Sequence, residues 1–299
     1  MTDQQSPNRR YDMKKSINLW ALPYPHKMTL KECFEVCKDA GFDGVELNYA
    51  LDEDDLSPKA SDKHIASIGE MARAMGLEIS GVCSFLFWPY SLTHQEPKQR
   101  QKGLELAMGM IRAANLLGTE NLLVVPGAVY VPWIKDVPPV PHDVCDRRAR
   151  EAIRRLIPEA EKHNVFLNIE NIFANGYLHS PQEINEFVDS FQSDRVHVHF
   201  DTGNISLYHF PEHWVPILGK RIRNVHVKEY SKNVNEFNLH AFRPLLDGTT
   251  NWPAVMEAFD RVGYHGYLTF EYFTPWPHWP EALVYQTSDA LDRMLGGKA

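Results

Sequence analysis

The sequence predicts an α/β fold in which eight strands and eight helices alternate and close into a single (β/α)8 barrel. Two observations lead to this prediction. Strand-like and helix-like segments alternate from end to end, and no linker rich in glycine, serine or proline divides the chain. Such alternation is typical of a parallel sheet, and a barrel of eight units takes about 250 residues. The 299 residues therefore fit one barrel domain.

The predicted elements follow one another in eight units. The strands are short apolar runs, expected at residues 16–20, 44–48, 78–84, 121–125, 165–170, 196–201, 222–227 and 267–272. The helices are the longer stretches between them, expected at residues 29–40, 62–75, 98–117, 144–162, 181–191, 211–218, 252–262 and 280–295. Glycine marks two helix-to-strand joints, 40–44 and 262–266, as is common where a helix ends. Residues 1–15 are predicted to form a flexible polar arm, and residues 16–299 the barrel.

The composition narrows the possible partners and compartment. The hydrophobic fraction of 43% is enough for a large core, and the formal charge is −8 with no long basic run. This charge argues against nucleic acid and anionic membranes as partners. No apolar stretch approaches the roughly 20 residues that span a bilayer, and the first fifteen residues lack the apolar core of a signal peptide. We therefore expect a cytoplasmic protein, and we expect its four cysteines to be buried thiols.

Four predicted strands end in side chains of the kind that bind metal ions. These side chains are Glu170 in NIENI, Asp201 in HFDTGN, His226 in NVHVKE and Glu271 in LTFEYF. Each alone would more often be an ordinary polar or core residue, but they occur one per strand on four consecutive strands. In a parallel barrel the carboxyl ends of the strands meet at the mouth where active sites lie. The sequence therefore predicts one divalent metal ion, with Mn²⁺ or Co²⁺ favoured over Mg²⁺.

A second polar layer is predicted beneath these ligands. Side chains alternate along a strand, so the residue two positions before each ligand also faces the interior. Those residues are Asn168, His199, Asn224 and Thr269, where a barrel layer is usually filled with valine, isoleucine and leucine. We expect at least two of them to hydrogen-bond a ligand and so orient it.

Four more polar residues near the predicted mouth are candidates for substrate contacts: Glu46, Asn204, Lys228 and Arg243. An ion pair at the barrel rim is the alternative for Glu46, and a solvated charge is the alternative for Lys228 and Arg243. No glycine-rich phosphate loop of either common type is present, so neither a nucleotide nor a flavin is expected.

Three long connections follow predicted strands on the side of the mouth, at residues 85–97, 126–143 and 230–251. Long loops inside compact domains are usually functional, and these are rich in aromatic residues. Two interpretations are open. The aromatic side chains form an apolar wall around a small polar ligand, or they form a subunit interface in a homo-oligomer, a dimer or tetramer.

The motifs GFDGVELN, NIENI, DTGN, HVKE and GYLTFEY resemble those of the sugar-phosphate isomerase/epimerase superfamily of xylose-isomerase-like TIM barrels, over residues 17–295. The resemblance implies one divalent metal ion bound by Glu170, Asp201, His226 and Glu271. It is closest to the ketose and ketose-phosphate 3-epimerases, in which the two glutamates also serve as acid and base. The free-ketose branch carries a second glutamate soon after the first ligand and a histidine three residues after the aspartate. This chain has Asn204 at the latter place.

This resemblance implies a sugar substrate and a proton-transfer reaction. A metal ion would polarise the carbonyl and its neighbouring hydroxyl, while carboxylates on opposite faces remove and return a proton through an enediolate. The alternatives are an aldose–ketose isomerase, a lyase or dehydratase acting on a keto-sugar or keto-inositol, and a non-catalytic sugar-binding subunit. A phosphodiesterase of the endonuclease-IV type would need a richer ligand set and a basic face, and neither is apparent.

Overall fold

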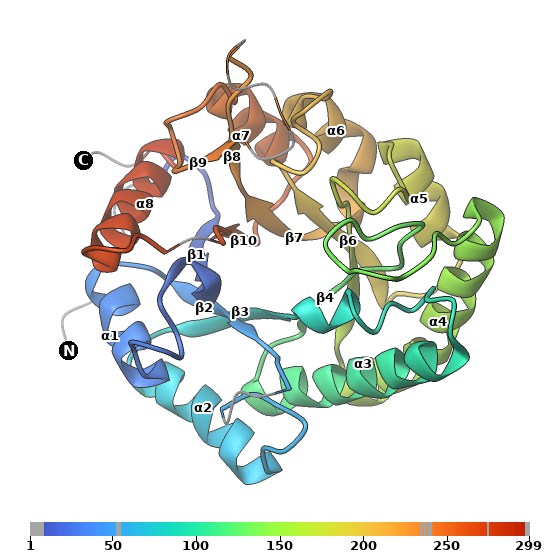
Figure 1. Ribbon diagram of the computed structural model, residues 1–299. Helices are drawn as coiled ribbons and strands as arrows, with labels where there is room; N and C mark the ends of the chain where they lie inside the picture. The colour runs from blue at the N-terminus through green and yellow to red at the C-terminus, as the bar shows by residue number, and fades with distance from the viewer. Residues whose placement is uncertain are drawn as a thin grey trace.

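The computed structural model is a closed barrel of parallel strands inside a ring of helices, which confirms the predicted fold class (Figure 1). It describes residues 9–51, 55–233, 235, 238, 241–273 and 275–296. Around the ring the strands follow the order β1-β10-β7-β6-β5-β4-β3-β2. These strands are β1 (Lys14–Asn18), β2 (Gly44–Asn48), β3 (Glu78–Cys83), β4 (Asn121–Val124), β5 (Phe166–Glu170), β6 (Val196–Asp201), β7 (Ile222–Val227) and β10 (Tyr267–Phe270).

The helices lie where the sequence predicts them, with ends shifted by at most two residues. They are α1 (Leu30–Asp39), α2 (Asp62–Ala74), α3 (Pro97–Leu117), α4 (His142–His163), α5 (Pro181–Asp189), α6 (Pro211–Leu218), α7 (Trp252–Arg261) and α8 (Pro280–Met294). Local signals fix several ends. Thr29 and Ser180 begin α1 and α5 with reciprocal capping boxes, and Gly118 and Asn164 end α3 and α4 in the left-handed conformation.

The start of the barrel differs from the prediction. β1 begins at Lys14, inside the segment predicted to be an arm. Lys15 Nζ donates to Ser288 Oγ and Asp292 Oδ2, both at 2.8 Å, and Lys14 Nζ ion-pairs with Glu78. Because both lysines are paired, this polar segment can form a strand of the barrel. The composition of the segment does not show that these partners exist. Residues 1–8 lie outside the described residues.

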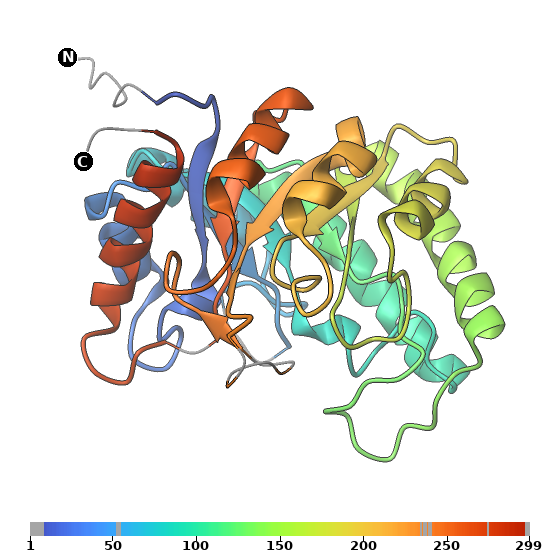
Figure 2. The ribbon, with the colours of Figure 1, turned by 90° about the horizontal axis from the view of Figure 1, so that it is seen from above.

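The strand register places the predicted ligands at one end of the barrel. Glu170 pairs in register with His199, and Asp201 with His226, so the ends of β5, β6 and β7 lie at one level. Figure 2 shows that the loops following the strands gather at this end, whereas β1 begins and α8 ends toward the opposite end.

A small element absent from the prediction follows β7. β8 (Glu229–Tyr230) pairs with β9 (Phe242–Arg243) as a two-stranded antiparallel sheet. The buried carboxylate of Glu229 organises this loop by accepting hydrogen bonds from Trp252 Nε1 at 2.6 Å and from the backbone N–H of Thr250 at 3.1 Å. Strands are recognised in a sequence by alternating apolar and polar residues, and two-residue strands are too short to show this alternation.

The four cysteines are free and buried, as predicted, at Cys33, Cys37, Cys83 and Cys145. Within the described residues, no helix has the length and apolar character required to cross a bilayer. The oligomeric state and the compartment stay predictions.

Candidate metal centre

The four predicted metal ligands converge at the mouth of the barrel. Glu170, Asp201 and His226 end or nearly end β5, β6 and β7, and Glu271 directly follows β10. Each offers one oxygen or nitrogen atom, and these atoms all lie within 4.8 Å of one another. All four side chains are buried. One ion could therefore contact all of them, since protein oxygens and nitrogens bind divalent ions at about 2.0–2.6 Å.

The imidazole of His226 supports this reading of the cluster. Its Nδ1 faces three carboxylates, at 3.6 Å from Glu170 Oε1, 3.9 Å from Asp201 Oδ2 and 3.5 Å from Glu271 Oε1. Within the part of the chain that the structure describes, this nitrogen has no hydrogen-bond partner. A buried polar atom without a partner is costly. Three oxygen donors and one nitrogen donor around such an atom suit a divalent cation.

The pKa values of Glu170 and His226 are shifted because both groups are buried and lie close to other charged groups. Burial, followed by the neighbouring charge of Glu271, raises the pKa of Glu170 to about 7. Burial alone would lower the pKa of His226, but the carboxylates of Glu46 and Glu271 outweigh it and raise that pKa well above its usual range. Without an ion, the protein therefore keeps protons among these groups that a bound cation would displace.

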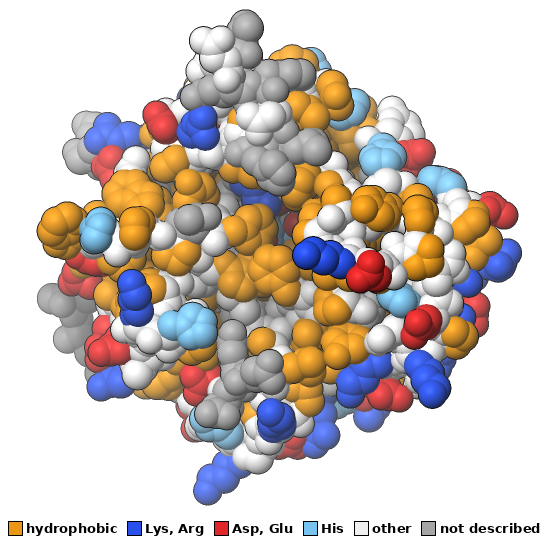
Figure 3. Space-filling view, viewed as in Figure 1, with side chains coloured by type: hydrophobic (Ala, Val, Ile, Leu, Met, Phe, Trp, Pro, Cys, Tyr) orange, Lys and Arg blue, Asp and Glu red, His pale blue; other side chains and the backbone are white. Residues whose placement is uncertain are grey.

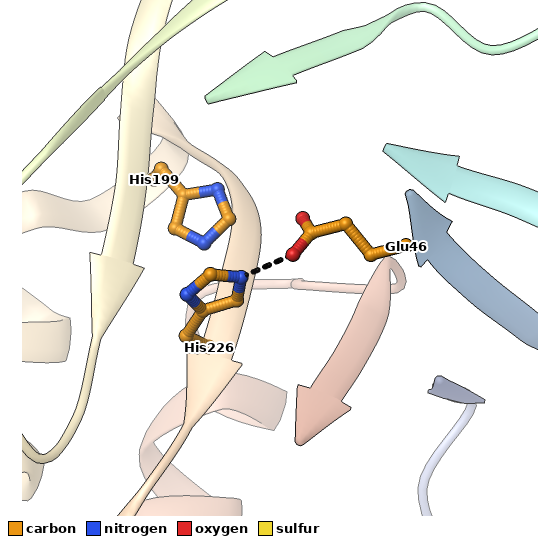
Figure 4. Close-up of side chains that lie close together, drawn as sticks. All are labelled: Glu46, His199 and His226. Atoms are coloured by element: carbon orange, nitrogen blue, oxygen red, sulfur yellow. Dashed lines mark hydrogen bonds and ion pairs between the residues drawn. The ribbon is translucent and has the colours of Figure 1, made fainter. Parts of the chain in front are cut away.

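Glu46 on β2 lies on the other side of the imidazole. Its Oε2 is 2.6 Å from His226 Nε2 and 2.6 Å from Asn18 Nδ2. A dashed line marks the contact with His226 in Figure 4. Glu46 is fully buried and does not line the cavity, so its predicted role as a substrate contact is wrong. A carboxylate that accepts the Nε2 proton leaves Nδ1 free to bind a metal ion, which is the usual arrangement behind a histidine ligand.

The polar layer beneath the ligands does not behave as predicted. Asn168 donates to Asn121 Oδ1 at 3.2 Å, and Asn224 donates to the Ser80 carbonyl at 3.3 Å. His199 packs edge-on against His226 with ring centroids 4.1 Å apart. Among the described residues, none of Asn168, His199, Asn224 and Thr269 hydrogen-bonds one of the four ligands. Two residues along a strand span about 6.6 Å, so Asn168 bonds to neighbouring β4 and Asn224 to β3 instead of reaching the ligands.

Lys228 places a buried ammonium group beside the cluster. Its Nζ lies 2.8 Å from Asp201 Oδ2, forms an ion pair with Glu271 and donates to Asn204 Oδ1 at 3.1 Å. Burial alone would lower the pKa of Lys228, but Asp201 and Glu271 raise it above the usual range. A Cβ at Gly203 would lie 2.7 Å from Lys228 Cβ, so the glycine of DTGN makes room for the lysine stem.

Asn171 is a residue of the site that the sequence reasoning missed. Its side-chain amide accepts from the Asp201 N–H at 2.9 Å and donates to the Asp201 carbonyl at 2.8 Å. Asp201 Oδ1 in turn accepts from the backbone N–H groups of Gly203 and Asn204, both at 2.8 Å. Asn171 follows Glu170 directly, and its amide chemistry is the signal that could have suggested such a clamp. Together these bonds hold Asp201 in one orientation.

A cavity of about 250 Å³ lies above the cluster. Glu170, Glu271, Lys228 and Asn204 line its base. Substrate contacts at Lys228 and Asn204 stay predictions. Arg243 lies on β9 and is not among the described lining residues. Hydrophobic side chains gather around the centre of this face of the molecule (Figure 3). His240, another polar residue of the loop after β7, lies outside the described residues.

Comparison with known proteins finds one matching family model and several similar barrels. A family model described as "Xylose isomerase-like TIM barrel" matches residues 34–294. An L-ribulose 3-epimerase from Mesorhizobium japonicum is 24% identical over 241 residues, which are 79% of this chain and 73% of that protein. A solved L-ribulose 3-epimerase superposes with a TM-score of 0.77 at 18% identity, covering 95% of each chain. D-Psicose 3-epimerase from Clostridium cellulolyticum H10 gives a TM-score of 0.77 at 18% identity, covering 94% of this chain and 98% of that one.

Proposed function

The chain belongs to the xylose isomerase-like TIM barrel family, and from this premise we propose that it is a divalent-metal-dependent ketose 3-epimerase. The observation that carries the proposal is the convergence of Glu170, Asp201, His226 and Glu271 around an unpaired buried nitrogen. The 3-epimerases among its relatives support the reaction class. The substrate would be a small sugar with a ketone group.

The four converging side chains would hold one ion, with Mn²⁺ or Co²⁺ favoured and Mg²⁺ also suited. When bound, such an ion would polarise a carbonyl and the neighbouring hydroxyl, which acidifies the proton on the hydroxyl-bearing carbon next to the carbonyl. Glu46, His199 and His226 form a second group of side chains whose possible metal-binding atoms lie close together. His226 Nε2 is already bonded to Glu46 at 2.6 Å, so we propose a single ion on the Nδ1 side.

Glu170 and Glu271 would carry the proton. They come from β5 and from the end of β10, and β6 and β7 lie between these strands in the ring. Both carboxylates line the cavity. One glutamate removes the proton from one face of the substrate carbon and the other returns a proton to the opposite face, which inverts that carbon. Lys228 beside Glu271 and Asp201 offsets negative charge at the base of the cavity.

The proposal is tested with the full chain, first stripped of metal by a chelator and then titrated with Mn²⁺. We expect one ion per chain by calorimetry, and epimerisation of free ketoses that returns only with the ion. In D₂O the product should gain deuterium at one carbon next to the carbonyl. Full activity in the metal-free protein, or no metal binding, would overturn the proposal. Consumption of the sugar with loss of water would instead identify the lyase alternative.

A further inference from the structure

The charged groups of the cavity lie at its base. Beyond Glu170, Glu271 and Lys228, the described lining residues with hydrogen-bonding side chains are Ser84, Asn204 and three tryptophans, whose indole N–H groups only donate. Ser84 Oγ already donates to the Tyr49 carbonyl and accepts from the Leu86 N–H. Asn204 donates to the Asn171 carbonyl at 2.9 Å and accepts from Lys228. Few side-chain acceptors therefore remain for hydroxyl groups that lie away from the base, and a buried hydroxyl without a partner is unfavourable.

The charges of the cavity disfavour a phosphorylated substrate. Lys228 is the one cationic side chain among the described lining residues, and it is already paired with Asp201 and Glu271. Phosphate sites in proteins usually supply arginine forks, lysines or several backbone N–H groups. A phosphate reaching Lys228 would also lie beside the carboxylates of Glu170 and Glu271, which repel it.

Aromatic side chains form one wall above the base. Trp20, Phe85 and Phe273 pack together, with ring centroids 4.4 Å apart for Trp20 and Phe85 and 5.5 Å apart for Trp20 and Phe273. They come from the segments that follow β1, β3 and β10. Phe85 and Phe273 are 46% and 44% exposed, so large apolar surfaces stand at the rim of the cavity.

A second aromatic wall comes from the segments that follow β3, β4, β5 and β7. Trp133 lies edge-on to Trp88 with centroids 4.9 Å apart and stacks on Phe173 at 6.0 Å, and Phe173 contacts Phe242 at 5.8 Å. Trp133 is 42% exposed. Both walls border the same cavity, so a flat apolar group entering it would contact rings from either wall.

From this division into a polar base and apolar walls, we propose that the substrate is an unphosphorylated keto-sugar that bears an aryl substituent. The inference rests on the proposed function, because it assigns the carbonyl end of the sugar to the metal-binding base. The cavity of about 250 Å³ is at the small end of ligand sites, which usually span about 300–1,000 Å³. It would hold the sugar, and the aryl group would extend between the exposed rings of the rim, as a glycoside aglycone does.

The test compares phenyl and methyl glycosides of one 3-keto-aldohexose, whose ketone stays free, together with a free ketose 6-phosphate, as ligands of the Mn²⁺-loaded full chain. Calorimetry should show the phenyl compound binding about tenfold more tightly than the methyl compound, since one aromatic ring is covered on binding. The ketose phosphate should bind more weakly than the same ketose without phosphate. Equal affinities for the phenyl and methyl compounds, or tighter binding of the phosphate, would overturn the inference.

Two variants test whether the aromatic walls, and not other parts of the surface, cause the preference for the phenyl compound. Trp133→Ala should remove most of the phenyl preference, and Phe85→Ala on the opposite wall should reduce it in the same direction. Trp279→Ala is the matched control, because Trp279 is 75% exposed and is not among the described lining residues. It should leave the preference unchanged. A Trp133 variant that keeps the preference but alters the oligomeric state would identify the rim as a subunit interface and overturn the inference.

These outcomes are distinct from failure of the proposed function. A protein that binds Mn²⁺ and epimerises ketoses without any phenyl preference contradicts only the aryl substituent. A protein that binds no metal ion contradicts the proposed function itself, whatever its preference among glycosides.

Discussion

The two halves of the barrel contribute to the site in different ways. β5, β6, β7 and the end of β10 supply all four side chains that converge at the mouth. β2 supplies Glu46, which bonds His226, and β1 supplies Asn18, which donates to Glu46. Neither is among the described lining residues of the cavity. The ligand-bearing half leaves His226 Nδ1 unpaired, whereas the supporting half pairs its Nε2. The His226 imidazole therefore presents Nδ1 to the proposed metal position, while Glu46 holds the ring in place through Nε2.

The largest expected effect concerns the proton carriers of the ligand-bearing half. Glu271→Gln should keep the fold but lower turnover by several orders of magnitude, because an amide cannot accept the proton. Turnover is measured by ketose epimerisation, with metal content determined in parallel. In D₂O this variant could still exchange the proton of one epimer through Glu170 without interconverting the two. Retained epimerisation in both Glu271→Gln and Glu170→Gln would refute the two-glutamate mechanism.

Lys228→Met tests how much the buried ammonium group stabilises the metal-free protein. Removing the buried partner of Asp201 and Glu271 leaves uncompensated carboxylates, a change that typically costs about 3–5 kcal/mol. Added Mn²⁺ should restore much of this stability, because the ion replaces the lost positive charge. Thermal melting with chelator and with Mn²⁺ measures both states. An equal loss of stability in the two conditions would show that Lys228 acts only through packing.

The supporting half is tested at Glu46. Glu46→Ala should weaken Mn²⁺ binding about 10–100-fold, because His226 loses the acceptor that fixes its tautomer. Glu46→Gln should have a smaller effect, since its amide oxygen can still accept the Nε2 proton. Thr269→Val is the matched control from the layer beneath the ligands, because the Thr269 hydroxyl has no partner among the described residues. A Thr269→Val variant that binds metal as poorly as Glu46→Ala would erase the distinction between the two.

The smallest expected effect is the pH dependence of metal affinity. The pKa of Glu170 is raised to about 7 by burial, so below that pH an ion must displace a proton from this carboxyl. Apparent Mn²⁺ affinity should therefore fall by up to about tenfold per pH unit as the pH drops below 7. In the metal-free protein the same shift makes folding less favourable as pH rises from the unfolded value of 4.5 to about 7. Because His226 also releases a proton when the ion binds, calorimetric titrations between pH 5.5 and 8 would show one constant slope if Glu170 were not a ligand, without the steeper fall below pH 7.

The sequence predicts well which four side chains converge at the mouth, because its signal is local and repeated. Each of Glu170, Asp201 and His226 closes or nearly closes an apolar strand, and parallel strands bring such ends together. The partner of His226 could not be predicted in this way. Glu46 approaches it from β2, three steps around the ring from β7, and no spacing along the chain encodes that distance. The alternation of side chains along β5 predicts which face of the strand Asn168 occupies, but it does not predict which group the Asn168 side-chain amide hydrogen-bonds.

The loop after β7 carries a consequence for engineering. Glu229 receives the N–H groups of Leu246, Thr250 and the Trp252 indole, so it joins the start of the loop to its end and to the start of α7. A Cβ at Gly248 would lie 2.3 Å from Glu229 Oε1, so a side chain at this position would displace the carboxylate. Exchanging loop residues between these two positions while keeping Glu229 and Gly248 should therefore vary the loop that carries Phe242 of the cavity lining and leave the barrel unchanged.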